Sequence, residues 1–320
     1  MTYIMLIFSM LVLTGCKDEQ NKQPELAKEN TTERVAITDN TENKETMEFN
    51  HGNCMVDNVE AIGDGKFTCS YEGVKHDFML DLPKTTEQAP LVVMLHGYGE
   101  SAEGFRMKVA FEEDANALGY AVVYVTGAPS SEDTTSANGW NSGVGESGND
   151  DVGFLCGLVN HLCETYDFDS TRVYAVGFSN GAFMTHRLAL EADDIFKSVV
   201  SVAGMMPERV WEEKPSDCSV GIFQVTGEKD DVVPKNSDGS ANYAKAPAIE
   251  DVMAYYVEKN GLSLTQTETV GKKSVLTKYE SSDSSKQVWD LLIPDGRHSW
   301  PDEQITGVNM NQLILDYLES

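Results

Sequence analysis

The chain has 320 residues, of which 41% are hydrophobic, so it can bury a large core. Acidic residues outnumber lysine and arginine by 52 to 24, which gives a net charge of −28. Residues 51–320 carry 43 acidic and 19 basic residues and thus −24 of this charge. A surface of that sign repels phosphate backbones, which argues against nucleic acid as a partner, and it disfavours strongly anionic ligands.

The first sixteen residues have the features of an export signal. Residues 3–13 form an apolar run that only Ser9 interrupts, too short to span a bilayer and typical of a signal-peptide core. The following L-T-G-C, residues 13–16, resembles a bacterial lipobox. It predicts that Cys16 is lipidated and that the exported protein, at the cell surface or in the periplasm, contacts the membrane only through this lipid anchor. The segment Met1-Thr2-Tyr3 lacks lysine and arginine, so an ordinary cleaved signal of a secreted protein and a mis-assigned start remain alternatives.

The next segment has a different composition from the rest of the chain. Residues 17–50 are polar and rich in Glu, Asn, Thr and Lys, without a periodic apolar face. Such a segment does not bury enough apolar surface to fold, and we expect a disordered tether. The sequence therefore predicts a signal peptide with lipobox at 1–16, a tether at 17–50 and one large α/β domain at 51–320.

Six short apolar runs, mostly without alternation and bounded by Gly or Pro, are typical of buried parallel strands. They are Leu91–Leu95, Ala121–Val125, Val173–Val176, Ser198–Ala203, Gly221–Val225 and Val288–Ile293. Helix-like stretches occur at Glu103–Leu118, Asp150–Tyr166, Asn180–Glu191, Ala248–Asn260 and Val308–Leu318. This order predicts an α/β fold whose central sheet is mainly parallel and is flanked by helices on both faces.

Three further segments concern the borders of that sheet. Val74–Leu82 alternates apolar and polar residues, which predicts an antiparallel hairpin strand at the sheet edge. Ser130–Asn149 and Lys235–Ala246 are loops rich in Gly, Ser and Asn. They are long enough to shape a binding cleft.

A G-x-S-x-G sequence at 177–181 lies between an apolar run at 172–176 and a helix-like segment at 182–190. Strand, G-x-S-x-G and helix is the order of a nucleophile elbow, a turn so tight that glycine is needed two residues to either side of the serine. The helix that follows aims its N-terminal N–H groups at the site. A surface turn is the alternative, but the position between strand and helix favours a serine hydrolase with Ser179 as its nucleophile.

A serine hydroxyl needs an adjacent base, usually a histidine held by a carboxylate. In the α/β-hydrolase order the acid follows the serine and the histidine comes last. Residues 221–234 form a strand that leads into an acidic loop, and Val288–Ile293 leads into a loop that contains His298. Both loops follow the C-terminal ends of strands, as the elbow does, and ligands bind at this edge of open α/β sheets. We predict Asp230 as the acid, with Asp231 as the alternative, and His298 as the base.

The other five histidines fit the role of base less well. One lies near the tether, one on the edge strand, one in the middle of a helix, one on the helix after the elbow and pointing away from it, and one before a glycine, where it supports a loop. They are His51, His76, His161, His186 and His96, in that order.

Two backbone N–H groups are expected to stabilise the tetrahedral oxyanion. One belongs to Asn180, the residue after the nucleophile. We assign the other to Tyr98, in the loop His96-Gly97-Tyr98-Gly99, because its glycines let the backbone approach the substrate closely. An ordinary strand-to-helix turn is the alternative for this loop.

Five cysteines follow Cys16, and an exported protein can form disulfides. Cys54 and Cys69 flank a short Gly-containing segment and are the favoured pair, and Cys163 with Cys218 is a weaker one. Cys156 and Cys163 lie on one expected helix, about 10.5 Å apart at 1.5 Å per residue, too far for a direct bond. At least one thiol should stay free. No C-x-x-C pair or histidine cluster indicates a metal site.

Five motifs together resemble a known family. They are L-H-G-Y-G at 95–99, D-D-V-G-F at 150–154, G-F-S-N-G at 177–181, V-V-P at 232–234 and H-S-W-P at 298–301. In this order they are similar to the bacterial esterases named for polyhydroxybutyrate depolymerase, which are close to the feruloyl and acetylxylan esterases of carbohydrate esterase family 1. The resemblance covers residues 60–318. It implies an α/β-hydrolase fold with Ser179, Asp230 and His298 as the triad. The family often has a histidine where Thr226 stands.

Two tryptophans are candidates for binding substrate. Trp140 and Trp300 lie near the expected cleft, where exposed aromatic rings stack on sugars or phenolic groups, although packing under loops is an equal alternative for Trp140. Asp150 and Asp151 precede a helix and most simply cap it.

The sequence therefore predicts an exported serine carboxylic-ester hydrolase that needs no cofactor or metal. Its expected partner is an ester substrate, polymeric or oligomeric: an acyl or feruloyl ester of a polysaccharide, with a polyhydroxyalkanoate-type polyester as the alternative. A peptidase is a further alternative, since the same triad cleaves amides, although we find no second, propeller-like domain to select peptides. A non-catalytic surface-binding lipoprotein is the hypothesis from a different class.

Overall fold

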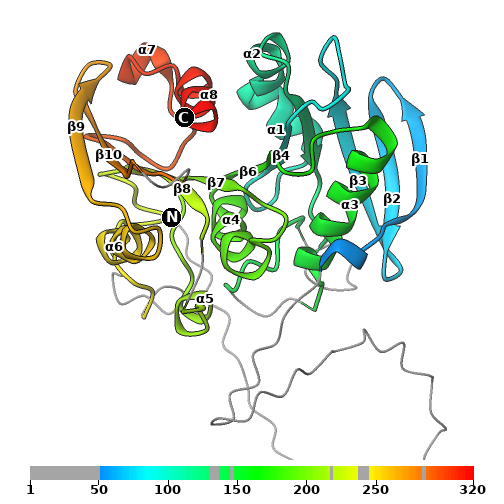
Figure 1. Cartoon of the computed structure of the whole chain (residues 1–320), viewed down its shortest axis with the longest axis horizontal. Helices are drawn as coiled ribbons and strands as arrows, with labels where there is room; N and C mark the ends of the chain where they lie inside the picture. Colours follow the sequence, from blue (N-terminus) through cyan, green and yellow to red (C-terminus); the bar gives the residue numbers. More distant parts are fainter. Residues whose placement is uncertain (1–50, 130–136, 145–147, 217–218, 237–244, 283–285) are drawn as a thin grey trace, which may run out of the picture. The chain divides into compact units, whose positions relative to one another are not determined.

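Six parallel strands form the centre of an eleven-stranded sheet in the computed structural model (Figure 1). The structure describes residues 51–129, 137–144, 148–216, 219–236, 245–282 and 286–320. The expected signal peptide, Cys16 and the tether lie outside these residues. The order across the sheet is β1-β2-β3-β5-β4-β6-β7-β8-β11-β10-β9. The parallel strands are β5 (Ala121–Val125), β4 (Leu91–Leu95), β6 (Val173–Phe178), β7 (Ser198–Val202), β8 (Gly221–Gly227) and β11 (Val288–Ile293).

These six strands are the six apolar runs, and five of them are buried at every position. A strand covered on both faces needs apolar side chains at successive positions, which is why these runs do not alternate. The prediction of a mainly parallel central sheet is confirmed.

Antiparallel strands extend the sheet on both sides. On one side β3 (Val74–Asp81) pairs with β5 and with β2 (Lys66–Tyr71), and β2 pairs with β1 (Asp57–Gly63). On the other side β10 (Ser274–Glu280) lies between β11 and β9 (Leu264–Val270). The alternating segment at 74–82 is thus a hairpin strand, but the expectation that it forms the sheet edge is wrong. The edge strand on that side is β1, which is almost wholly exposed.

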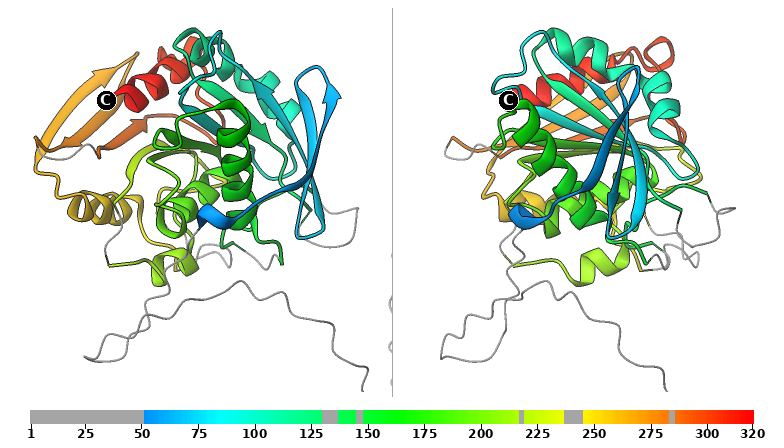
Figure 2. Two further views of the ribbon diagram at one scale, coloured as in Figure 1. Left: turned by 45° about the vertical axis from the view of Figure 1, so that its right-hand side comes forward. Right: turned by 90° about the vertical axis from the view of Figure 1, so that its right-hand side faces the viewer.

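Helices cover both faces of the sheet, as Figures 1 and 2 show. One face packs against α3 (Asp151–Tyr166), α4 (Asn180–Glu191) and α6 (Ile249–Lys259). The other packs against α1 (Ala102–Val109), α2 (Phe111–Ala117) and α8 (Met310–Glu319). Three short helices complete the described chain: the 3-10 helix η1 (His51–Asn53), α5 (Glu208–Glu212) and α7 (Glu303–Thr306).

The single helix expected at 103–118 is two helices, separated at Ala110. This residue adopts the left-handed conformation, with φ 45° and ψ 39°. The turn lets the buried Phe111 donate its N–H to the Tyr124 hydroxyl at 3.1 Å, and the same hydroxyl donates to Glu112 at 2.7 Å. Tertiary hydrogen bonds therefore replace the helical ones that the local sequence favours.

The disulfide expected between Cys54 and Cys69 is not formed. Both are free thiols, as are Cys156 and Cys163, and Cys218 lies outside the described residues. The β1–β2 ladder starts at Asp57 opposite Ser70, so Cys54 lies beyond the paired residues, beside the Tyr71 hydroxyl. Cys69 is buried within β2, where burial raises the pKa of its thiol to about 12. The spacing in sequence did not reveal that the hairpin register separates the two.

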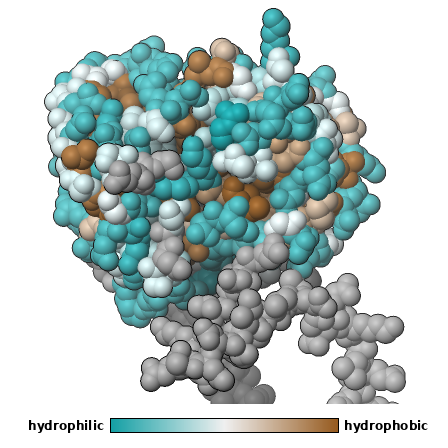
Figure 3. All heavy atoms as spheres, viewed as in Figure 1, coloured by the Kyte–Doolittle hydropathy of each residue, from teal (hydrophilic) through white to brown (hydrophobic). Residues whose placement is uncertain are grey.

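The surface in Figure 3 is largely hydrophilic, with hydrophobic residues in small scattered groups. None of the helices in the described ranges is long and apolar enough to cross a membrane.

Candidate active site

Ser179 lies in the sharp turn between β6 and α4. Its φ of 54° and ψ of −118° belong to a region that favours glycine, and its N–H donates to the Val202 carbonyl at 3.0 Å. A Cβ atom at Gly177 would overlap the Gly181 carbonyl, and one at Gly181 would overlap the Leu95 carbonyl. The glycines of the motif are therefore required by backbone packing, and the turn holds the serine hydroxyl beyond the strand end.

The loops after β8 and β11 meet beside this turn. A Cβ at Gly227 would lie 2.6 Å from the Gly296 carbonyl oxygen, so the two backbones are in direct contact. Lys229 donates its N–H to the same carbonyl at 2.8 Å, and Glu228 donates to Ile293 at 3.0 Å. These contacts bring the acidic loop and the histidine loop together, although 68 residues separate Asp230 from His298.

Ser179, His298 and Asp230 form one hydrogen-bonded chain. The Ser179 Oγ lies 2.9 Å from His298 Nε2, and His298 Nδ1 lies 2.8 Å from Asp230 Oδ2. An ionised carboxylate only accepts, so Nδ1 carries the proton and Nε2 of the neutral ring accepts from the hydroxyl. This is the proton arrangement that a serine nucleophile and its base require.

Asp230 is the acidic residue that faces the imidazole. Its Oδ1 accepts the N–H groups of Val232 and Val233 at 2.9 and 2.8 Å, which leaves Oδ2 for the histidine. Its neighbour Asp231 is exposed. The geometry therefore agrees with the predicted choice of Asp230 over Asp231.

The loop after β4 is held by the buried ring of His96. Its Nε2 accepts the Gly127 N–H at 2.9 Å, so Nδ1 carries the proton and donates to the Gly97 carbonyl at 2.7 Å. Burial lowers the pKa of His96, which keeps the ring neutral. The loop-supporting role expected for this histidine agrees with these contacts.

The two candidate oxyanion donors are left without protein acceptors. The Gly97 N–H is taken by the Glu100 carboxylate at 3.1 Å, and the Gly99 N–H by the Asn138 carbonyl at 2.8 Å. Within the described ranges, the N–H of Tyr98, between these two, and the N–H of Asn180 have no such partner. Two unpaired N–H groups beside a serine nucleophile are what an oxyanion hole consists of.

The expectation that Trp140 offers an exposed ring to substrate is wrong. Its side chain is 4% exposed, and its Nε1 donates to the His96 carbonyl at 2.9 Å. The ring fills space under the loop because Gly127 has no side chain: a Cβ there would lie 3.1 Å from the indole. Trp140 therefore packs inside the protein.

Trp300 belongs to an aromatic cluster next to the histidine. It is partly buried and meets Phe105 and Phe178 edge-on, with ring centroids 5.7 and 6.5 Å apart. The Phe178 centroid lies 5.3 Å from that of His298. Trp300 can therefore contribute an apolar surface close to the nucleophile.

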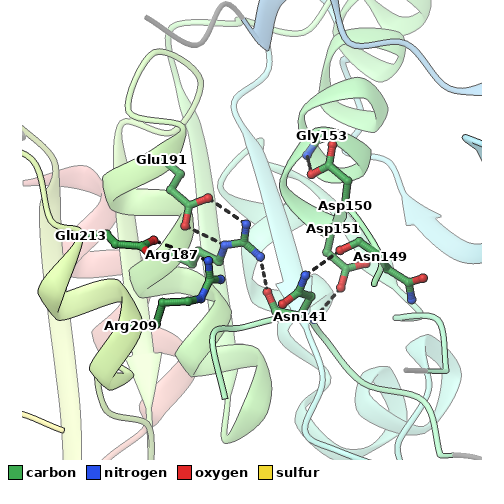
Figure 4. Close-up of polar contacts among 9 residues, drawn as sticks. All are labelled: Asn141, Asn149, Asp150, Asp151, Gly153, Arg187, Glu191, Arg209 and Glu213. Carbon is green, nitrogen blue, oxygen red and sulfur yellow. Dashed lines mark hydrogen bonds and ion pairs between the residues drawn. The ribbon is translucent and has the colours of Figure 1, made fainter. Parts of the chain in front are cut away.

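Asp150 and Asp151 do different things, which the sequence did not reveal. Asp150 caps α3 by accepting the Gly153 N–H at 3.0 Å, as expected. Asp151 does not cap the helix: it is 1% exposed and accepts the Asn141 N–H at 2.6 Å (Figure 4). Burial raises its pKa to about 7, although the Asn141 N–H and Arg187 lower it.

His76 and His186 lie outside the hydrogen-bonded chain of Ser179, His298 and Asp230. His76 stacks on Phe154 with ring centroids 3.6 Å apart, and His186 is fully buried in α4. Burial lowers the pKa of both rings to about 4. Across the described ranges, no group of three or more His, Cys, Asp or Glu side chains could hold a metal ion.

Comparison with known proteins adds the family. Residues 76–253, more than half of the chain, match the family described as Esterase PHB depolymerase. NocK of Nocardia uniformis subsp. tsuyamanensis is 27% identical over 68% of this chain and 67% of its own. Feruloyl esterase B of Talaromyces funiculosus is 26% identical over 46% of this chain. Poly(3-hydroxyalkanoate) depolymerase C of Paucimonas lemoignei is 26% identical over 69% of this chain. The chain spans 43% of that feruloyl esterase and 57% of that depolymerase.

The fold has solved counterparts. An acetyl xylan esterase from Aspergillus awamori aligns with a TM-score of 0.55 at 14% identity, over 76% of this chain and 94% of its own. The family match defines an esterase, and the fold is that of the α/β-hydrolases. More narrowly, the chain belongs to the Esterase PHB depolymerase family.

Proposed function

We propose that Ser179, His298 and Asp230 are the catalytic triad with which this serine esterase cleaves carboxylic esters through an acyl-enzyme. The observation that carries the proposal is the pair of hydrogen bonds of 2.9 and 2.8 Å that link the three side chains. The two unpaired N–H groups of Tyr98 and Asn180 support it.

The reaction follows from these positions. Ser179 Oγ attacks the ester carbonyl while His298 Nε2 takes its proton, and Asp230 stabilises the imidazolium. The Tyr98 and Asn180 N–H groups bind the oxyanion. The imidazolium then protonates the leaving alcohol. Water, activated by the regenerated imidazole, attacks the acyl-enzyme, and the acid leaves as Ser179 recovers its proton.

Replacing the nucleophile tests the triad. Ser179→Ala should lower kcat for p-nitrophenyl esters by at least about a thousandfold while the protein stays folded, because oxyanion binding alone remains. A fluorophosphonate should label the wild-type protein at Ser179 and leave the variant unlabelled. Full activity of the variant would contradict the proposed nucleophile. An inactive wild type that the fluorophosphonate does not label would favour a non-catalytic binding protein.

For the substrate, we propose acyl or feruloyl esters of polysaccharides. Trp300 is partly exposed, packs on the buried rings of Phe178 and Phe105 beside His298, and offers an apolar surface that suits an aromatic acyl group. The alternative is a polyester of hydroxyalkanoates, because the match to the Paucimonas depolymerase extends over more of this chain than the match to the Talaromyces feruloyl esterase.

Matched substrates separate these candidates. The polysaccharide-ester proposal is supported if one of two kcat/KM values is at least tenfold above that for hydroxybutyrate oligomers. These are the values for release of ferulate from feruloylated oligosaccharide and of acetate from acetylxylan. The reverse ratio supports the polyester. Trp300→Ala should raise KM for methyl ferulate more than for p-nitrophenyl acetate, since only the ferulate ester carries an aromatic ring in its acyl part.

We further propose that Cys16 carries the lipid that anchors the protein. The support is the L-T-G-C sequence at 13–16. Cys16→Ala should move the protein from the membrane fraction to the soluble fraction of an expressing bacterium. Membrane association that survives this substitution would contradict the anchor.

A further inference from the structure

Residues 138–142, here called the bridging segment, contact both loops that supply the candidate oxyanion donors. On one side they hold the loop that contains Tyr98: the Asn138 carbonyl accepts the Gly99 N–H at 2.8 Å, and the Asn138 side chain donates to the Glu100 carbonyl at 3.0 Å. The Trp140 indole donates to the His96 carbonyl at 2.9 Å. The bridging segment is thus bonded to residues on both sides of Tyr98.

On the other side the bridging segment is bonded to the start of α4. The Asn180 side chain accepts the Trp140 N–H at 2.7 Å and donates to the Ser142 hydroxyl at 3.0 Å. Asn180 is also the residue whose own backbone N–H is the second oxyanion donor. The separation of the two donors therefore depends on where residues 138–142 lie.

A third attachment, at Asn141, comes from two charged side chains (Figure 4). Asp151 at the start of α3 accepts the Asn141 N–H at 2.6 Å, and Arg187 of α4 donates to the Asn141 carbonyl at 2.5 Å. Glu191 holds the Arg187 guanidinium in a two-point ion pair, at 2.7 and 2.9 Å. Asn141 is thereby hydrogen-bonded at both its backbone N–H and its backbone carbonyl.

The burial of these charges is costly. Asp151 is 1% exposed and its Oδ1 has no hydrogen-bond partner, while Arg187 is 9% exposed. Burying a carboxylate with one unsatisfied oxygen opposes folding. The high pKa of Asp151, about 7, reflects the same cost. Asp151 and Arg187 are buried at a cost in stability, and both hydrogen-bond to the backbone of one loop residue, Asn141. Their presence is better explained by the position in which they hold Asn141.

We propose, resting on the triad proposed above, that Asp151 and Arg187 are positioning residues that hold the bridging segment so that the Tyr98 and Asn180 N–H groups stay at the separation the oxyanion needs. Neither touches the substrate. Oxyanion donors work only near 2.7–3.1 Å from the developing charge, and displacements of about 1 Å can cost on the order of a hundredfold in rate. Loss of the grip should therefore weaken binding of the transition state and leave binding of the ground state intact.

Substitutions at Arg187 test the hydrogen bond that its guanidinium donates to the Asn141 carbonyl. Arg187→Met removes the guanidinium and should lower kcat roughly tenfold to a hundredfold, with KM within about twofold of wild type. Arg187→Lys keeps one donor and should lose about threefold to tenfold. Arg209 of α5 forms an i,i+4 ion pair with Glu213, just after the end of this helix, and among the contacts that Figure 4 draws no hydrogen bond or ion pair links Arg209 to the bridging segment. Arg209→Met is therefore the matched control and should leave both constants unchanged.

Substitutions at Asp151 test the acceptor side. Asp151→Leu removes the acceptor and should resemble Arg187→Met. Asp151→Asn keeps a carbonyl oxygen for the Asn141 N–H and should stay within about threefold of wild type. An equal loss in both variants would contradict the acceptor role.

A boronic acid that forms a tetrahedral adduct with Ser179 supplies a readout that loss of stability alone does not change. Its inhibition constant should rise in each variant by the same factor by which kcat/KM falls. This inference would be overturned if folded Arg187→Met and Asp151→Leu kept the wild-type kcat and boronate affinity. If Ser179→Ala were inactive in the same experiment, the proposed triad would still stand. Should the Met variant not fold, an unchanged Arg187→Lys has the same meaning. An active Ser179→Ala would instead overturn the proposed function.

Discussion

Ser179 occupies a backbone conformation that is unfavourable for a residue with a side chain. Its φ of 54° is maintained because β6, α4 and the Val202 carbonyl fix the chain on both sides. The motif around it specified this conformation, because only glycine fits at 177 and 181. By contrast, the partner carboxylate was a choice between neighbours, and only the hydrogen bonds of Asp230 to Val232, Val233 and His298 in the folded loop distinguish it from Asp231.

The two neighbouring acids give a sharp test at this scale. Asp230→Asn should lower kcat by about three to four orders of magnitude, because the histidine loses the group that fixes its tautomer. Asp231→Asn should stay within twofold, since its exposed side chain does not contact the imidazole. Steady-state kinetics on an activated ester measures both, and the reverse pattern would assign the acid to Asp231.

His76 predicts how stability depends on pH. Burial lowers its pKa from 6.5 to about 4, so between these values the unfolded chain binds the proton more readily. Stability should therefore fall as the pH is lowered through this window, by about 2–3 kcal/mol from this residue. His76→Phe keeps the stacking on Phe154, and between pH 7.5 and 4.5 this variant should lose less stability than the wild type does.

Urea unfolding at the two pH values measures this difference. His161→Gln is the control, because His161 lies on α3 without being buried, and it should follow the wild type. Parallel loss of stability in wild type and His76→Phe would contradict the assignment.

At the scale of elements, burial on two faces explains which strands were predictable. The central strands are continuous apolar runs because helices cover both sides, whereas β1 and β9 lie at the sheet borders and are almost entirely exposed. Their sequences therefore resemble loops. The register of the β1–β2 hairpin, which decides that Cys54 and Cys69 stay apart, was equally hidden.

The break between α1 and α2 predicts a stabilising substitution. A φ of 45° is sterically unfavourable for Ala110 but not for glycine, which lacks a Cβ. Ala110→Gly should therefore stabilise the protein by about 0.5–1 kcal/mol. Ala117→Gly, at the exposed end of α2, should instead destabilise it by up to about 1 kcal/mol. Urea unfolding of both variants measures the two signs, and a destabilising Ala110→Gly would contradict the strain.

At the scale of the molecule, the dominant feature is charge. The excess of −24 in residues 51–320 is carried by a surface that Figure 3 shows to be mainly hydrophilic. Charges of one sign repel one another in the compact state and are separated on unfolding. Salt shortens the range of this repulsion from about 10 Å at 0.1 M to about 3 Å at 1 M.

The protein should therefore become more stable in salt. Raising NaCl from 0.05 to 1 M at pH 7.5 should add about 1–2 kcal/mol, or roughly 2–5 °C in Tm. At pH 4.5, close to the sequence pI of 4.4, the same addition should have little effect because the net charge is near zero. Calorimetry at both pH values measures this, and equal shifts at the two would rule out screening as the cause.

The sequence alone determined the fold class and the family resemblance, and it predicted the nucleophile and its base. These depend on local requirements: apolar runs for buried strands, glycines for a tight turn, and a fixed chain order for the triad. Only the tertiary structure decided that Trp140 is buried, that Asp151 grips Asn141 instead of capping α3, and that Cys54 does not meet Cys69. Each of these outcomes depends on which distant segment lies opposite a residue, and that pairing is set by strand register and loop packing over the whole domain.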